Sequence, residues 1–120
     1  MPRSPLAYLT DIIGACDAIE YVLDGVDLEA YKGSRPIRSA VEREFILIGE
    51  AVGSLVRLQP ELSERISRAR MIVGFRNQLA HDYAAINDAI VWAIAVNDAP
   101  VLRAECRSLV IEVEATAESD

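Results

Sequence analysis

The chain has 120 residues, of which 52% are hydrophobic and 26% are charged. This length and composition predict a single domain over residues 1–120 and exclude a disordered chain. The formal net charge of −7 argues against a general polyanion binder. Because we find neither an apolar run of about 18 residues nor a charged-then-apolar leader, we expect a soluble, cytoplasmic protein with no membrane partner.

The charge is unevenly distributed. From Lys32 to Arg76 there are nine basic and five acidic residues, a local charge of +4, whereas three basic and fourteen acidic residues elsewhere give −11. A basic middle segment can hold phosphates locally, because contacts within a Debye length matter more than the total charge. Charge alone nevertheless favours a simpler interpretation, in which these arginines lie on solvated helix faces.

The first predicted helix begins at Ser4-Pro5, an N-cap followed by a proline suited to a first turn. Its apolar residues recur at steps of three and four, the spacing of a helix packed on others: Leu9, Ile12, Cys16, Ile19 and Leu23. Gly25 ends this helix, and residues 26–33 are expected to form a loop with a short helical turn.

A second helix is predicted from about residue 34 to residue 58, where Pro60 breaks it. Its apolar residues alternate steps of four and three over two heptads: Val41, Phe45, Ile48, Val52 and Leu55. Three further apolar residues, Ile46, Leu47 and Val56, widen this face. We therefore expect the helix to contact neighbours on two sides.

The remaining chain is also predicted to be helical. Residues 61–70 are expected to form a short polar helix, followed by a helix over about 71–86. Asn87 or Asp88 can cap the next helix, which ends before Pro100 restarts the chain. A last helix is predicted over 101–113, followed by an acidic, frayed tail at about 114–120. The fold class is therefore all-α: an antiparallel four-helix bundle with an additional short helix.

The two cysteines, Cys16 and Cys106, each occupy an apolar helical position. One disulfide is compatible with this placement, but buried reduced thiols in a cytoplasmic protein are favoured. With no CxxC pair and a single histidine, we expect neither a metal site nor a cofactor.

The stretch GFRNQLAHDY, residues 74–83, contains that histidine, His81. An imidazole can transfer protons near neutral pH, and an arginine such as Arg76 presents a fork of donors to a phosphate. Together they could support attack of an RNA 2′-hydroxyl on its own 3′-phosphate without a metal. On an ideal helix, however, residues five apart point about 140° apart. An enzyme built on this motif should therefore be a two-fold dimer, in which Arg76 approaches His81 of the partner subunit.

These residues also have ordinary interpretations. Arg-x4-His alone is a weak pattern, and Tyr83 could be a packing residue with a hydrated hydroxyl. Glu50, directly after Gly49 on an apolar helix, needs a partner if it is buried. Arg43, seven residues earlier on the same face, is a candidate to share a supporting site with Glu50.

The motif at residues 76–83 resembles the Arg-x4-6-His signature of the HEPN superfamily, in the Arg-x4-His-x-Tyr form of HepT-like toxins. Residues 43–51 resemble the Arg-x5-Gly-Glu-Ala helix of that family. Residues 91–94 and 100–102 are similar to its Val-Trp and Pro-x-Leu segments. The resemblance thus covers about residues 5–110 in order, which makes it far more specific than the motif alone.

This resemblance implies an all-helical homodimer that acts as a metal-independent endoribonuclease, cleaving an RNA such as tRNA. It also implies a type VII HEPN/MNT toxin–antitoxin system with an MntA-type minimal nucleotidyltransferase as antitoxin. Arg76 would stabilise the phosphate, His81 would be the acid/base, Asn77 a polar supporter and Tyr83 the acceptor of AMP. Two alternatives remain open: a non-catalytic HEPN interaction module that binds the nucleotidyltransferase, and a plain helical dimer without an active site.

Overall fold

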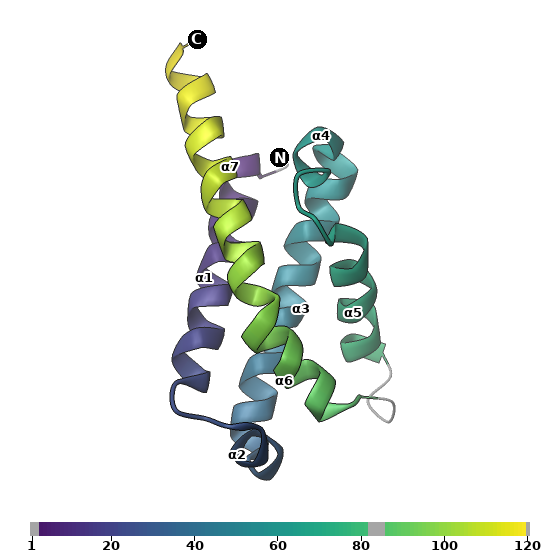
Figure 1. Ribbon diagram of the computed structural model, residues 1–120. Helices are drawn as coiled ribbons and strands as arrows, with labels where there is room; N and C mark the ends of the chain where they lie inside the picture. The colour runs from purple at the N-terminus through teal and green to yellow at the C-terminus, as the bar shows by residue number, and fades with distance from the viewer. Residues whose placement is uncertain (1–2, 82–85, 120) are drawn as a thin grey trace.

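The computed structural model describes residues 3–81 and 86–119 and shows the chain as a bundle of helices (Figure 1). Within these residues there are seven helices and no strand, so the predicted all-α class is confirmed. The helices are α1 (Pro5–Leu23), α2 (Leu28–Gly33), α3 (Arg35–Leu58), α4 (Pro60–Ser63), α5 (Ala69–His81), α6 (Asp88–Asn97) and α7 (Ala99–Ser119). Across the described ranges, no helix has the length and apolar character needed to cross a membrane.

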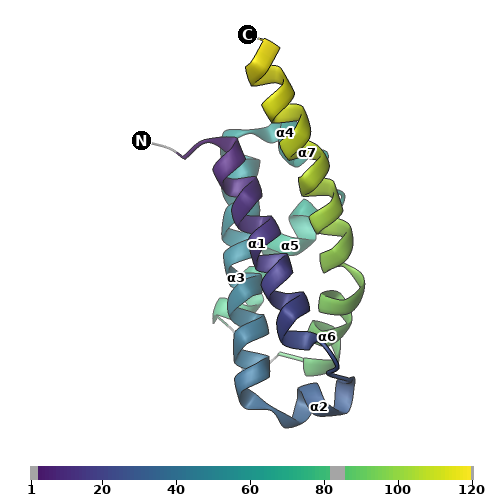
Figure 2. The same cartoon turned by 90° about the vertical axis from the view of Figure 1, so that its left-hand side faces the viewer.

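The central helix is α3, which packs against α1 on one side and against α5 on the other. The third long helix, α7, runs beside α1, and α6 leads directly into it (Figures 1 and 2). The short helix α2 closes one end of the bundle. The two-sided packing of α3 agrees with the width of its predicted apolar face.

The predicted heptad positions form the core. On α1, Leu9, Ile12 and Ile19 are at most 1% exposed. The five heptad residues of α3 are likewise buried, with Val52 and Leu55 fully inaccessible. Burial of these side chains provides the main stabilisation of the bundle, because each contributes about 1.5–3 kcal/mol relative to an exposed position.

The predicted helix starts are formed by side-chain caps. Ser4, Ser34 and Asn87 each accept hydrogen bonds from amides two or three residues ahead, which satisfies donors that a helix start leaves free. Gly25 follows α1 with a φ of +72°, a conformation that favours glycine. The turn after α1 therefore depends on this glycine.

Two predicted boundaries are wrong, and a third lies partly outside the described residues. The expected helix over 61–70 is limited to α4, since the Ser63 hydroxyl donates to the Pro60 carbonyl at 2.8 Å and turns follow. The helix expected to reach about Ile86 is described as far as His81, residues 82–85 lie outside the described part, and Ile86 itself belongs to no helix. The last helix continues past Val113 to Ser119, because its end is rich in Ala and Glu and lacks Gly and Pro.

Both cysteines are free and buried at the packing of α1 on α7. Burial raises the pKa of the Cys16 thiol and that of the Cys106 thiol to about 12. The two thiols are therefore protonated at neutral pH, as expected of small apolar core residues.

Candidate functional site

Arg76 lies where α5 makes its closest approach to α3. Opposite it stands Gly49, at which an added Cβ would lie 2.1 Å from the Arg76 Cβ and 2.5 Å from its Cγ. Only a glycine permits this approach, because real Cβ atoms do not come so close to other carbons. The stem of Arg76 therefore lies directly on the backbone of α3.

Two neighbours hold the Arg76 guanidinium. It donates to the Glu50 carboxylate at 3.0 Å and to the Asn77 side-chain oxygen at 3.1 Å. These bonds use two of its five N–H donors, while the buried Nε has no partner among the described residues. With its side chain 26% exposed, Arg76 has a fixed position and donors left for an anion.

His81 is the last residue of α5 and is exposed. It makes no hydrogen bond or ion pair with any residue that the structure describes. Arg76 is directed toward α3, whereas His81, five residues later, emerges on another side of the helix. One protomer therefore presents the two motif residues on different sides of α5.

Glu50 is exposed and pairs with Arg76, whereas Arg43, the candidate to share its site, makes no hydrogen bond or ion pair with it. Arg43 is exposed and has no ion pair within residues 3–81 and 86–119. The physical reason is distance along α3: Gly49 brings α5 next to Glu50, while Arg43 lies about 10 Å away along the helix axis. A glycine in the interior of a long helix lowers its stability, so the presence of Gly49 in the sequence was a signal that another helix packs closely there.

Tyr83 lies outside the described residues, and so does Asp82. Of the six residues singled out from the sequence, the structure thus joins three, Arg76, Asn77 and Glu50, in one hydrogen-bonded group. Arg43 and His81 remain as separate exposed side chains on the same two helices.

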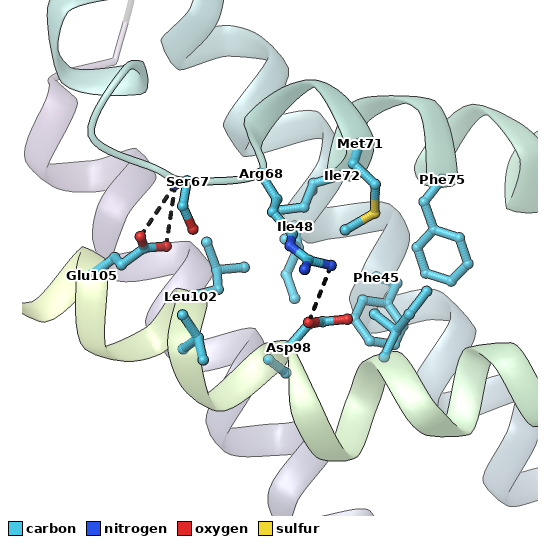
Figure 3. Close-up of a pocket in the computed structure, with 13 residues that line it drawn as sticks. Phe45, Ile48, Ser67, Arg68, Met71, Ile72, Phe75, Asp98, Leu102 and Glu105 are labelled. Atoms are coloured by element: carbon cyan, nitrogen blue, oxygen red, sulfur yellow. Dashed lines mark hydrogen bonds and ion pairs between the residues drawn. The ribbon is translucent and has the colours of Figure 1, made fainter.

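A pocket of about 260 Å³ lies on the other side of α5, between α3, α5 and α6–α7 (Figure 3). Its lining is mainly apolar and includes the rings of Phe45 and Phe75, whose centroids are 5.2 Å apart in an edge-to-face arrangement. Phe75 lies two residues before Asn77, which turns its side chain about 160° away from that residue. The motif residues do not line this pocket.

Near this pocket, polar contacts join the α4–α5 segment to α7 and to Asp98, the residue directly before α7. They join Arg65 to Glu112 at 2.7 Å, the Ser67 N–H to Glu105 at 3.2 Å and Arg68 to Asp98 at 3.5 Å. Figure 3 shows the second and third of them. The three carboxylates are spaced at steps of seven residues, which places them in one row. We call these the α7 acidic contacts.

Comparison with known proteins identifies the family of this chain. A family model described as Ribonuclease HepT-like matches residues 12–109. The chain belongs to the HepT-like ribonuclease family. The predicted resemblance is therefore confirmed.

Individual relatives agree with this membership. The chain is 34% identical over 104 residues to "Putative RNase MJ1380" of Methanocaldococcus jannaschii, covering 86% of this chain and 94% of the relative. It is 31% identical over 113 residues to "Probable ribonuclease HepT" of Thermococcus cleftensis, covering 91% and 98%. It is 27% identical over 109 residues to "Putative RNase TTE0752" of Caldanaerobacter subterraneus subsp. tengcongensis, covering 89% and 95%. The matches thus span most of this chain and nearly the full length of each relative.

Proposed function

We propose that this HepT-like protein is an endoribonuclease toxin that cleaves RNA without a metal ion. The observation that carries the proposal is the Arg76 guanidinium, which Glu50 and Asn77 hold in place on the helix that also presents His81. A fixed cation with free donors suits the negative charge that develops on a phosphate during transfer. The names of the relatives, all of them ribonucleases, support the same substrate class.

In the proposed reaction, the 2′-oxygen of a ribose attacks the adjacent 3′-phosphate. A bond from the 2′-oxygen to phosphorus forms and the bond from phosphorus to the 5′-oxygen breaks, which leaves a 2′,3′-cyclic phosphate and a 5′-hydroxyl. The 2′-hydroxyl loses a proton and the leaving 5′-oxygen gains one. We assign proton transfer to His81, a contribution of about a hundredfold to ten-thousandfold. Arg76 stabilises the charge on the pentacoordinate phosphorus.

The proposal includes a homodimer. Because Arg76 and His81 leave α5 on different sides, a two-fold partner would bring Arg76 of one protomer toward the histidine of the other. The dimer would also supply a second imidazole where the reaction needs both an acid and a base. Each catalytic group would then come from a rigid helix.

We further propose a type VII toxin–antitoxin system in which an MntA-type nucleotidyltransferase silences this toxin. The acceptor would be Tyr83, two residues beyond His81 in the sequence. An AMP group at that position would add bulk and negative charge beside the motif, and both would repel an RNA phosphate.

Removing the proposed acid/base tests the enzyme. We expect His81→Ala to abolish RNA cleavage and growth arrest while secondary structure and oligomeric state remain unchanged, since His81 is exposed and makes no hydrogen bond or ion pair with described residues. The measurement is cleavage of total cellular RNA with mapping of the ends. If the wild type, freed of its partner, cleaves no RNA at any pH from about 5 to 9, where an imidazole changes charge, the alternative of a non-catalytic interaction module replaces the enzyme.

The proposed modification is tested at Tyr83. Incubation with the nucleotidyltransferase and ATP should add the mass of AMP to the wild type and no mass to Tyr83→Phe. Intact-mass spectrometry followed by peptide mapping measures both. Tyr31, which is fully buried on α2, offers a control: Tyr31→Phe should accept AMP as the wild type does. Modification retained in Tyr83→Phe contradicts the assignment.

A further inference from the structure

Most arginines of the described chain are matched by a carboxylate. Seven of them lie within 4 Å of an Asp or Glu: Arg3, Arg38, Arg65, Arg68, Arg76, Arg103 and Arg107. Four exposed arginines on α3 and α5, Arg35, Arg43, Arg57 and Arg70, differ because they have no ion pair with any described residue. Three of them, Arg43, Arg57 and Arg70, lie within about 10 Å of Arg76 along the helices. Arg57 makes only a neutral hydrogen bond, to Ser54 at 3.2 Å. Their charges are therefore available to a ligand.

These three arginines share one face of the molecule. On α3, Arg43 and Arg57 each lie seven residues from Glu50, so all three form one row. On α5, Arg70 lies seven residues from Asn77 and forms a second row with it. Since the Arg76 guanidinium bonds both Glu50 and Asn77, the two rows flank the same side of the α3–α5 seam.

The positions along the seam follow from the helix contacts. Helices α3 and α5 run in opposite directions (Figure 1), with Gly49 opposite Arg76 and Gly53 opposite Val73. Continuing this register places Arg57 and Arg70 at one level, about 10 Å from Arg76 along the helices. Arg43 lies about 10 Å to the other side, at the end where His81 stands. Positive charge thus occurs at three levels over about 20 Å, with Arg76 in the middle.

We propose that Arg43, Arg57 and Arg70 form a phosphate-binding track that holds a single RNA strand along the α3–α5 seam, on both sides of Arg76. Guanidinium forks match phosphate oxygens, and basic grooves that follow the backbone are how proteins hold single strands. This inference rests on the proposed function, which requires a strand to pass Arg76.

The surrounding charges favour this path. Glu50, the carboxylate on the seam, is matched by Arg76. Glu64 shares a shallow depression with Arg70 but makes no ion pair with it among the described residues. Outside residues 32–76 the chain carries a charge of −11, so an RNA strand is repelled from the rest of the surface.

The test measures RNA binding in a His81→Ala parent, which removes cleavage, with a fluorescent unstructured oligoribonucleotide as probe. Arg43→Gln, Arg57→Gln and Arg70→Gln are compared singly and together across a salt series. Each lost phosphate contact should make the slope of log affinity against log salt shallower by about 0.7, and the triple variant by about 2. Circular dichroism verifies that each variant is folded.

Arg35→Gln is the matched control. Arg35 is also exposed, unpaired in the described chain and carried by α3, but it lies about 22 Å from Glu50 along the helix. Its slope should equal that of the parent. A triple variant with the parent's slope overturns the track, as does a parent that binds no oligoribonucleotide at any salt concentration. RNA cleavage by the wild type is measured separately, so the proposed function survives either outcome if cleavage is observed.

Discussion

Gly49 fixes the position of the arginine on which the proposed chemistry depends. It has no side chain, and the absence of one lets the Arg76 stem lie on α3 beside Glu50. A glycine inside a helix is less stable than alanine by about 0.5–1 kcal/mol, so its presence calls for a packing reason. The close approach of α5 is that reason.

Gly49→Ala should therefore displace α5. The added methyl would overlap the Arg76 stem, at a cost of about 1–3 kcal/mol if the helices stay together. We expect a lower free energy of unfolding and a loss of RNA cleavage, measured by urea denaturation and by the cleavage assay.

Gly14→Ala is the matched control for this variant. Gly14 also lies inside a helix, but no atom lies within 4 Å of an added Cβ there. This variant should be more stable than the wild type by about 0.5–1 kcal/mol and should keep its activity. Equal stability changes in the two variants would show that Gly49 has no special packing role.

At the residue scale, the chemistry of an arginine and a histidine on one helix, together with the family resemblance, singled out Arg76, Asn77 and His81 as candidates, and helical spacing assigned each a direction. The sequence did not reveal the partner of Glu50. That contact joins residues 26 apart on two helices, and it exists only because Gly49 sets the distance between them. Arg43, the partner chosen from the same helix, lies a full two turns away.

At the scale of elements, the two buried thiols lie where α1 packs against α7. The pKa values of Cys16 and Cys106 are raised by burial from about 9 to about 12 in the folded protein. In the unfolded chain the thiols ionise first, so the unfolded state binds fewer protons as the pH rises above 9. The stability associated with the protonated thiols is complete below pH 9 and is lost as the pH approaches 12.

The predicted result is a free energy of unfolding that falls between pH 9 and about 12, by up to about 1.4 kcal/mol per pH unit for each thiol. Urea denaturation at a series of pH values measures it. The double variant Cys16→Ala, Cys106→Ala should show a flatter dependence over the same range, although the lost packing lowers its stability at neutral pH. Parallel profiles for the two proteins argue against ionisation of the thiols as the cause.

Helix positions and helix starts were predictable because apolar spacing and capping residues are local signals. The C-terminal ends of the helices were harder to predict. Ser63 closes α4 through its own hydroxyl, and α7 continues to Ser119 through residues that favour a helix without any apolar stripe. Hydrophobic periodicity locates the packed part of a helix and misses a continuation that projects from the bundle, as α7 does in Figure 1.

At the scale of the whole molecule, Arg76 and His81 point in different directions, and we therefore expect one site to be shared between two protomers. Arg76→Ala and His81→Ala should each be inactive alone. If a site consists of Arg76 of one protomer and a single His81 of the other, mixing the variants under exchange conditions should restore roughly a quarter of the wild-type activity, because half of randomly paired dimers are mixed and each holds one such site. The measurement is RNA cleavage by the mixture against each variant alone. Absence of any recovery, with exchange verified by differently tagged subunits, contradicts a site made of one Arg76 and a single His81 from opposite protomers.

The α7 acidic contacts indicate that the helices differ in their free energy of local unfolding. Helix α5 packs on α3, and the segment before it is fastened to α7 by exposed charged groups, whose attraction weakens with salt. The α1–α7 contact also includes ion pairs, formed by Arg103 and Arg107 with carboxylates of α1, but α1 buries five residues whereas α5 buries one. Amide hydrogens at the start of α5 should therefore exchange with solvent sooner than those of α1, and sooner still at high ionic strength. The local unfolding of the helix that carries the motif therefore depends on ionic strength.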